Sequence, residues 1–129
     1  MKTLFSLRFH QSPETRALTE SHKAVAGWLT EWGTLFLDHV VWKAFGPITP
    51  EQHVFQLDFV ILPERGRDPF QHVLVEIIED DPSLLFTTRD IARRNLLREL
   101  WPGTMLSLDA RDIRQHPDIV QLRLLNALS

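Results

Sequence analysis

The chain has 129 residues, 43% of them hydrophobic and 24% charged, a balance typical of one globular domain over residues 1–129. The net charge of −3 argues against a protein that coats nucleic acid through bulk electrostatics, and the absence of cysteine excludes disulfides, thiolate catalysis and cysteine-based zinc sites. No apolar run approaches the ~18 residues that a transmembrane helix needs. We therefore expect a cytoplasmic protein with no membrane partner.

The N-terminal part predicts one long amphipathic helix. Residues 1–12 fit either a short first strand or an ordered arm ahead of a core over residues 13–129. Ser12 followed by Pro13 is typical of a helix start, with serine as the N-cap. Apolar positions recur at spacings of three and four and predict a helix over 14–32, with this stripe: Leu18, His22, Val25, Leu29 and Trp32.

Three strands should follow that helix. Residues 35–45 are rich in β-branched and aromatic side chains, which favour a strand. Residues 54–62 and 73–78 are nearly continuous apolar runs separated by a charged turn with glycine and proline. The run at 73–78 is apolar enough to predict a central strand that is buried on both faces.

The remainder predicts a helix, a strand and a closing helix. Residues 88–100 form an amphipathic pattern that Pro102-Gly103 ends. Residues 104–108 predict a fourth strand, 109–117 a polar connection and 118–128 a closing helix. Because a helix separates the third and fourth strands, they should form a βαβ crossover in a mixed sheet with helices on its faces.

Two acids, Asp58 and Glu76, stand alone in the second and third apolar strands. A buried carboxylate is costly unless it is paired, hydrogen-bonded or bound to a metal. Since strand side chains alternate between faces, both carboxylates can meet at one point if the strands are adjacent and in register. A divalent cation such as Mg²⁺ would relieve their repulsion, because it prefers hard oxygen ligands. The alternative is that both acids are structural, hydrogen-bonded to the backbone or paired with an arginine.

The cations are mostly arginine, eleven against three lysines. Four arginines lie in the predicted helix 88–100 as two i, i+4 pairs: Arg89 with Arg93, and Arg94 with Arg98. They are candidate contacts to nucleic-acid phosphates. A solvated helix face is the alternative.

Four short segments together resemble a known family: LDFVIL, HVLVEIIEDD, RD-x-x-RR-x-x-L and WPGTMLSLDARDI. They are similar to motifs of the PD-(D/E)XK nuclease superfamily, in the branch near the very-short-patch-repair endonucleases, over roughly residues 18–128. The resemblance implies an α/β, restriction-endonuclease-like fold. Its core has the order helix, three strands, helix, strand, with a central mixed four-stranded sheet flanked by helices.

Site residues carry over from this resemblance by position. Asp58 matches the metal-binding Asp and Glu76 the first acid of the E-x-(K/D) pair, while Glu20 resembles a first-helix Glu of some members. The chain departs from the motif at Ile78, where a Lys or Asp is expected. Candidates for the missing third catalytic residue are Asp80, Lys43 and His39.

These observations leave three functions open. The resemblance implies a DNA endonuclease that depends on Mg²⁺ or Mn²⁺, with the metal held by Asp58 and Glu76. The isoleucine at position 78 and the acidic net charge favour instead a catalytically inactive nuclease-fold module that binds DNA or a protein partner. The third function is a plain interaction protein with structural acids, for example a dimer formed through an exposed sheet edge.

Overall fold

The computed structural model describes residues 9–11, 19–45, 52–62, 72–78 and 88–129. Its strands are β1 (Phe9–Gln11), β2 (Leu35–Phe45), β3 (Gln52–Leu62), β4 (Val73–Ile78) and β5 (Thr104–Asp109). Its helices are α1 (Glu20–Glu31), α2 (Thr88–Leu100), α3 (Ala110–Gln115) and α4 (Pro117–Leu128). Among the described helices, none combines the length and the apolar character needed to cross a bilayer.

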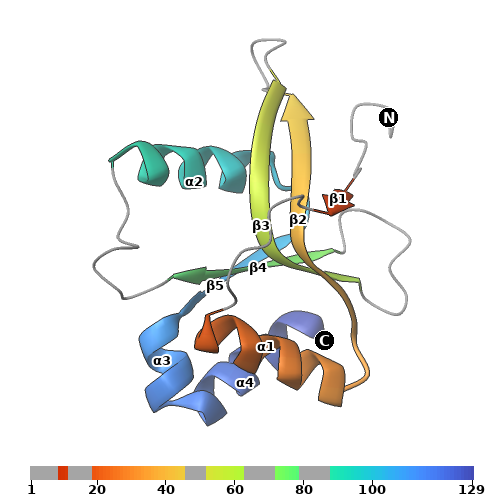
Figure 1. Ribbon diagram of the computed structural model, residues 1–129, viewed down its shortest axis with the longest axis vertical. Helices are drawn as coiled ribbons and strands as arrows, with labels where there is room; N and C mark the ends of the chain where they lie inside the picture. The colour runs from red at the N-terminus through yellow and green to blue at the C-terminus, as the bar shows by residue number, and fades with distance from the viewer. Residues whose placement is uncertain (1–8, 12–18, 46–51, 63–71, 79–87) are drawn as a thin grey trace.

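The strands form one mixed sheet in the order β1-β2-β3-β4-β5 (Figure 1). The pairs β1–β2, β2–β3 and β3–β4 are antiparallel, and β4–β5 is parallel with α2 as the crossover between them. The predicted α/β class, the mixed sheet and the βαβ crossover are therefore confirmed. The short β1 adds a fifth strand to the four that the sequence predicts for the core.

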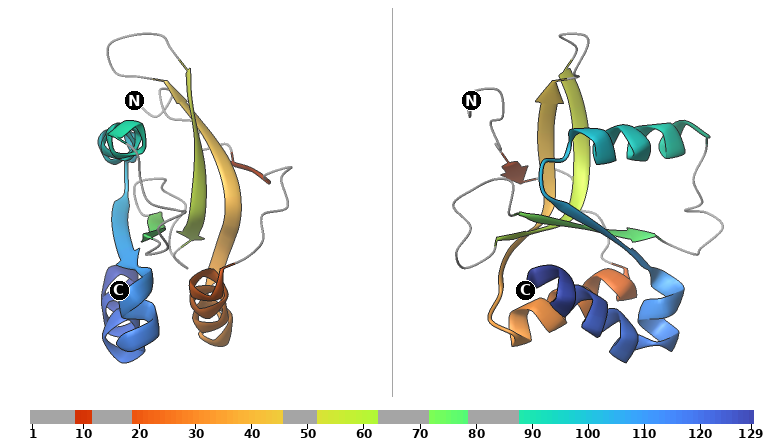
Figure 2. Two further views of the ribbon diagram at one scale, coloured as in Figure 1. Left: turned by 60° about the vertical axis from the view of Figure 1, so that its left-hand side comes forward. Right: turned by 180° about the vertical axis from the view of Figure 1, so that it is seen from behind.

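Helices cover both faces of the sheet. Figures 1 and 2 show α2 on one side of β4 and β5, and α1, α3 and α4 on the other. The helical-layer core lies beneath the sheet and is built from Val25, Leu29, Phe59, Ile61, Val73, Val75, Ile77, Leu108, Ala110, Ile113, Val120 and Leu124. The α2 core lies on the opposite side and is built from Val40, Trp42, Ala44, Phe55, Leu57, Val60, Leu74, Leu97 and Trp101. Strand β4 supplies both cores, which explains its nearly continuous apolar sequence.

The β2–β3 hairpin changes direction at Asp58 and His39. Leu57 and Phe59 have the same parity along β3, yet Leu57 belongs to the α2 core and Phe59 to the helical-layer core. In β2, His39 has a φ of 48°, a left-handed conformation that is unusual for a residue other than glycine. The hairpin therefore bends, and Figure 1 shows β2 and β3 curving together. The change of core between Leu57 and Phe59 places the bend at Asp58.

The first helix is shorter than the sequence predicts. Thr19 is its N-cap, with an extended backbone (φ −71°, ψ 160°) and a hydroxyl that accepts a hydrogen bond from the His22 N–H at 3.1 Å. The predicted continuous helix over 14–32 is therefore wrong, because Thr19 has an extended backbone and α1 begins at Glu20; residues 14–18 lie outside the described residues. The proposed cap at Ser12 lies outside the described residues. The predicted stop is confirmed, since Gly33 has a φ of 68° directly after the helix.

The predicted polar connection over 109–117 is also wrong, because it contains the short helix α3. Asp109 caps this helix by accepting a hydrogen bond from the Arg111 N–H at 2.8 Å. Ala110 and Ile113, three residues apart, are its buried positions. A six-residue helix buries few side chains, here two, so the composition of the segment resembles that of a loop. The predicted closing helix is confirmed as α4, which begins with Pro117 in its first turn.

Candidate functional site

Asp58 and Glu76 lie next to each other on neighbouring strands. The β3–β4 register pairs Phe59 with Val75, and extending it by one residue places Asp58 opposite Glu76. The Asp58 carboxylate accepts a hydrogen bond from the Ile77 N–H at 2.9 Å. A side chain thus takes the acceptor role that a backbone carbonyl has in a regular ladder. The two acids meet where the hairpin bends.

Glu76 is a buried acid that contacts a guanidinium group from the helix above it. Its side chain is 10% exposed, and its Oε2 lies 3.1 Å from Nε of Arg94, whose side chain is 18% exposed. Oε2 is buried and accepts no directed hydrogen bond, so the contact is chiefly ionic. Burial raises the pKa of Glu76 above its ordinary value; Asp58 raises this pKa further, while Arg94 and Arg98 lower it. Glu76 therefore occupies a place where a nearby cation is strongly favoured.

Three arginines of α2 interact with side chains of the sheet. Arg94 contacts Glu76, and Arg98 lies near enough to affect the same carboxylate although its side chain is exposed. Arg93 places its guanidinium carbon 5.1 Å from the centre of the Phe55 ring. The side chain of Arg89 lies outside the described residues. Asp58, Glu76, Arg94 and Arg98 thus form one polar group, which we call the acid–arginine cluster.

Other sequence-predicted site residues lie elsewhere. Lys43 is exposed and pairs with Val54, four positions along β3 from Asp58. Glu20 is on the surface of α1, where its side chain is 94% exposed and its carboxylate lies 3.5 Å from the Lys23 ammonium group. The structure does not bring Lys43 or Glu20 to the acid–arginine cluster. Asp80 lies outside the described residues.

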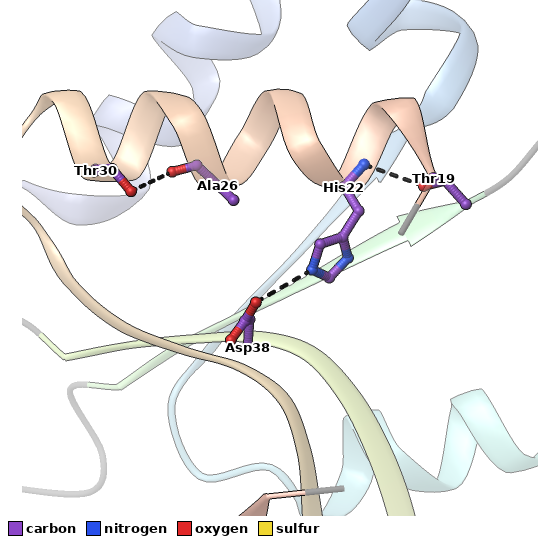
Figure 3. A network of polar contacts seen from close by, with 5 residues as sticks. All are labelled: Thr19, His22, Ala26, Thr30 and Asp38. Carbon is purple, nitrogen blue, oxygen red and sulfur yellow. Dashed lines mark hydrogen bonds and ion pairs between the residues drawn. The ribbon is translucent and has the colours of Figure 1, made fainter. Parts of the chain in front are cut away.

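The structure places His39 in a second polar group that the sequence does not predict. The His39 ring lies 4.1 Å from the ring of His22 on α1, which stacks on Phe59 at 4.3 Å. His22 Nε2 is 3.8 Å from Asp38 Oδ2. Figure 3 shows the His22 ring pointing from α1 toward Asp38. Successive strand residues normally point to opposite faces. The left-handed backbone of His39 breaks this alternation, so that Asp38 and His39 both approach His22.

The histidine at the centre of this group is neutral near pH 7. His22 is 4% exposed, and its Nε2 makes no hydrogen bond. Burial lowers its pKa from 6.5 to about 4, with His39 adding to the effect and Asp38 opposing it. The only sequence signal for His22 is its position on the apolar stripe of the first helix. That position predicts burial of the ring but not its contacts to Asp38 and His39.

The donor set of the acid–arginine cluster fits a hard divalent cation. Mg²⁺ is usually held by one or two carboxylates together with water and substrate phosphate, and Asp58 and Glu76 supply such a pair. The buried Glu76 Oε2, which accepts no hydrogen bond, is the atom best placed to gain from a bound cation. Within the described part of the chain, no group of three or more His, Asp or Glu side chains is arranged to hold a metal ion. Water and phosphate would have to complete the coordination shell.

Fold and cluster together define an α/β domain in which a buried acid, Glu76, and a half-buried acid, Asp58, lie beside an arginine-bearing crossover helix. Comparison with known proteins adds no relative: no protein-family model matches the chain, and no match is found among the curated proteins or the solved structures.

Proposed function

We propose that this chain is a nuclease-like domain of the restriction-endonuclease type that binds DNA phosphates and holds Mg²⁺ or Mn²⁺ between Asp58 and Glu76. The observation that supports it is the meeting of the two lone strand acids at the bend of the β2–β3 hairpin, beneath α2. A metal bound there would activate water and stabilise the charge that develops during phosphodiester hydrolysis.

Each residue of the cluster has a distinct role in this proposal. Asp58 and Glu76 hold the cation, and the Ile77 N–H fixes the orientation of the Asp58 carboxylate. Arg98 is exposed and lies near the acids, so it is the residue that would contact a phosphate of the DNA backbone. Asp80 remains a candidate for the missing third residue of the motif, and it lies outside the described residues.

A second candidate is a catalytically inactive nuclease-fold module that binds DNA or a protein partner. Two observations favour it: Ile78 stands where the motif has Lys or Asp, and Arg94 already neutralises Glu76 at 3.1 Å. In this case the Asp58–Ile77 hydrogen bond and the Glu76–Arg94 ion pair serve only to join β3, β4 and α2.

A cleavage assay separates the two candidates. Purified protein is incubated with single-stranded and double-stranded DNA in Mg²⁺ and then in Mn²⁺, beside Asp58→Asn and Glu76→Gln. Asp38→Asn is the matched control, since Asp38 lies with His22 and outside the acid–arginine cluster. The proposal predicts metal-dependent cutting that both cluster variants lose and the control keeps. An absence of cutting, with DNA affinity that still falls steeply with salt, would support the inactive DNA-binding module instead.

A further inference from the structure

The guanidinium group of Arg94 contacts the carboxylate of Glu76, one of the two acids that the proposed function assigns to the metal. Its Nε lies 3.1 Å from Oε2, the buried oxygen that accepts no hydrogen bond. A guanidinium and a divalent cation at one carboxylate oxygen repel each other, and both cannot be accommodated at close range. Arg94 is therefore a direct competitor of any metal at the Asp58–Glu76 pair.

We propose that Arg94 is an autoinhibitory latch, which keeps divalent cations from the Asp58–Glu76 pair until a phosphate group draws its guanidinium away from Glu76. The inference rests on the proposed function, in that it takes the two acids as the metal site. It goes further by making metal binding conditional on the nucleic-acid ligand.

The exchange is chemically balanced. Arginine binds phosphate oxygens with the same paired N–H donors that it offers to carboxylates, so a phosphate is a suitable competing partner. When the guanidinium leaves, the metal takes its place, and the buried Glu76 carboxylate is neutralised in both states. A buried Glu76 carboxylate with neither the guanidinium nor the metal beside it would be costly. The departure of Arg94 and the binding of the metal are therefore coupled.

The position of Arg94 on α2 permits such a movement. Its side chain is 18% exposed, so part of it already reaches solvent. Arg98 follows four residues later on the same side of the helix and is exposed, so a phosphate held by Arg98 would lie beside Arg94. By linkage, metal and DNA must then increase each other's affinity by the same factor.

The test is Mn²⁺ binding to the full chain without nucleic acid, followed by the electron paramagnetic resonance signal of free Mn²⁺. The latch predicts that Arg94→Gln binds Mn²⁺ more tightly than the wild type by about tenfold or more, equivalent to at least 1.4 kcal/mol. Arg93→Gln is the matched control, because Arg93 is the neighbouring residue on α2 and contacts Phe55 instead of the acids. Asp58→Asn combined with Arg94→Gln should lose the gain.

The outcomes separate the latch from the proposed function. Equal Mn²⁺ affinity of wild type and Arg94→Gln would refute the latch and leave the metal pair intact. No Mn²⁺ binding by either protein, with or without DNA, would refute the metal pair itself.

A second measurement keeps the latch testable if Arg94→Gln does not fold. A short DNA duplex should raise the Mn²⁺ affinity of the wild-type chain several-fold, after correction for Mn²⁺ bound by the duplex alone. Arg94→Lys, which keeps the positive charge, should show the same dependence on DNA. Wild-type Mn²⁺ affinity that is unchanged by the duplex would overturn the proposal.

Discussion

The ion pair between Glu76 and Arg94 should contribute measurably to stability, and Arg94→Met tests this contribution. At 3.1 Å and an effective dielectric constant of about 20, the Coulomb attraction is about 5 kcal/mol before desolvation is subtracted. Removing one partner from a buried pair costs about 3–5 kcal/mol. We expect about 3 kcal/mol for Arg94→Met, the lower end of that range, because Glu76 can relieve its charge by taking up a proton.

Urea unfolding at neutral pH measures this free energy, with tryptophan fluorescence as the signal. Trp42 and Trp101 are suitable probes, since their rings meet edge to face 5.1 Å apart in the α2 core. The double variant Arg94→Met with Glu76→Leu should lie within about 1 kcal/mol of the wild type, because no buried charge remains. Arg93→Met, the control, should cost no more than about 1 kcal/mol. Purely additive single and double effects would refute the reasoning, since they would show that the two side chains are not coupled.

Three further predictions concern α1 and its contacts. Because the folded-state pKa of His22 is lowered from 6.5 to about 4, the unfolded state binds more protons between these values, and stability should fall by up to about 3 kcal/mol as the pH drops through them. His22→Phe should remove this part of the pH dependence in urea unfolding; an unchanged profile would contradict the assignment. Gly27→Ala should stabilise the protein by about 0.5–1 kcal/mol, since Gly27 is an exposed position of α1 with open space for an added Cβ, whereas Gly33→Ala should cost about 1 kcal/mol because of its φ of 68°. A change in Tm of the same sign for Gly27→Ala and Gly33→Ala would contradict this prediction. Thr19→Ala should cost about 1 kcal/mol by removing the cap hydrogen bond, and a neutral effect in the same assay would show that the cap contributes little.

Much of the sheet could be predicted from the sequence because its signals are local. Strand β4 has the predicted bounds, since its nearly continuous apolar run reflects burial on both faces. The adjacency of Asp58 and Glu76 follows from strand alternation once β3 and β4 are neighbours in an antiparallel pair. The two acids and their meeting point could therefore be predicted from the sequence, provided that β3 and β4 are neighbours.

The partners of these acids could not be predicted, because they depend on how distant elements cross. Nothing local indicates that Arg94, rather than Arg93 or Arg98, lies over Glu76, since that depends on the rotation of α2 above β4. The hydrogen bond from Ile77 to Asp58 depends on the end of the β3–β4 ladder. The left-handed conformation of His39 lies at the bend of the hairpin, and no glycine in the sequence signals it.

The central claim is that Asp58 and Glu76 bind a divalent cation once Arg94 is displaced. The most direct test is a crystal structure of the wild-type chain with Mn²⁺ and a short DNA duplex, using the anomalous signal of manganese to locate the ion. The account predicts an anomalous peak in contact with both carboxylates, with the Arg94 guanidinium moved from Glu76 to a phosphate. Crystals that contain the duplex but show no peak at this pair, with Arg94 still on Glu76, would contradict it.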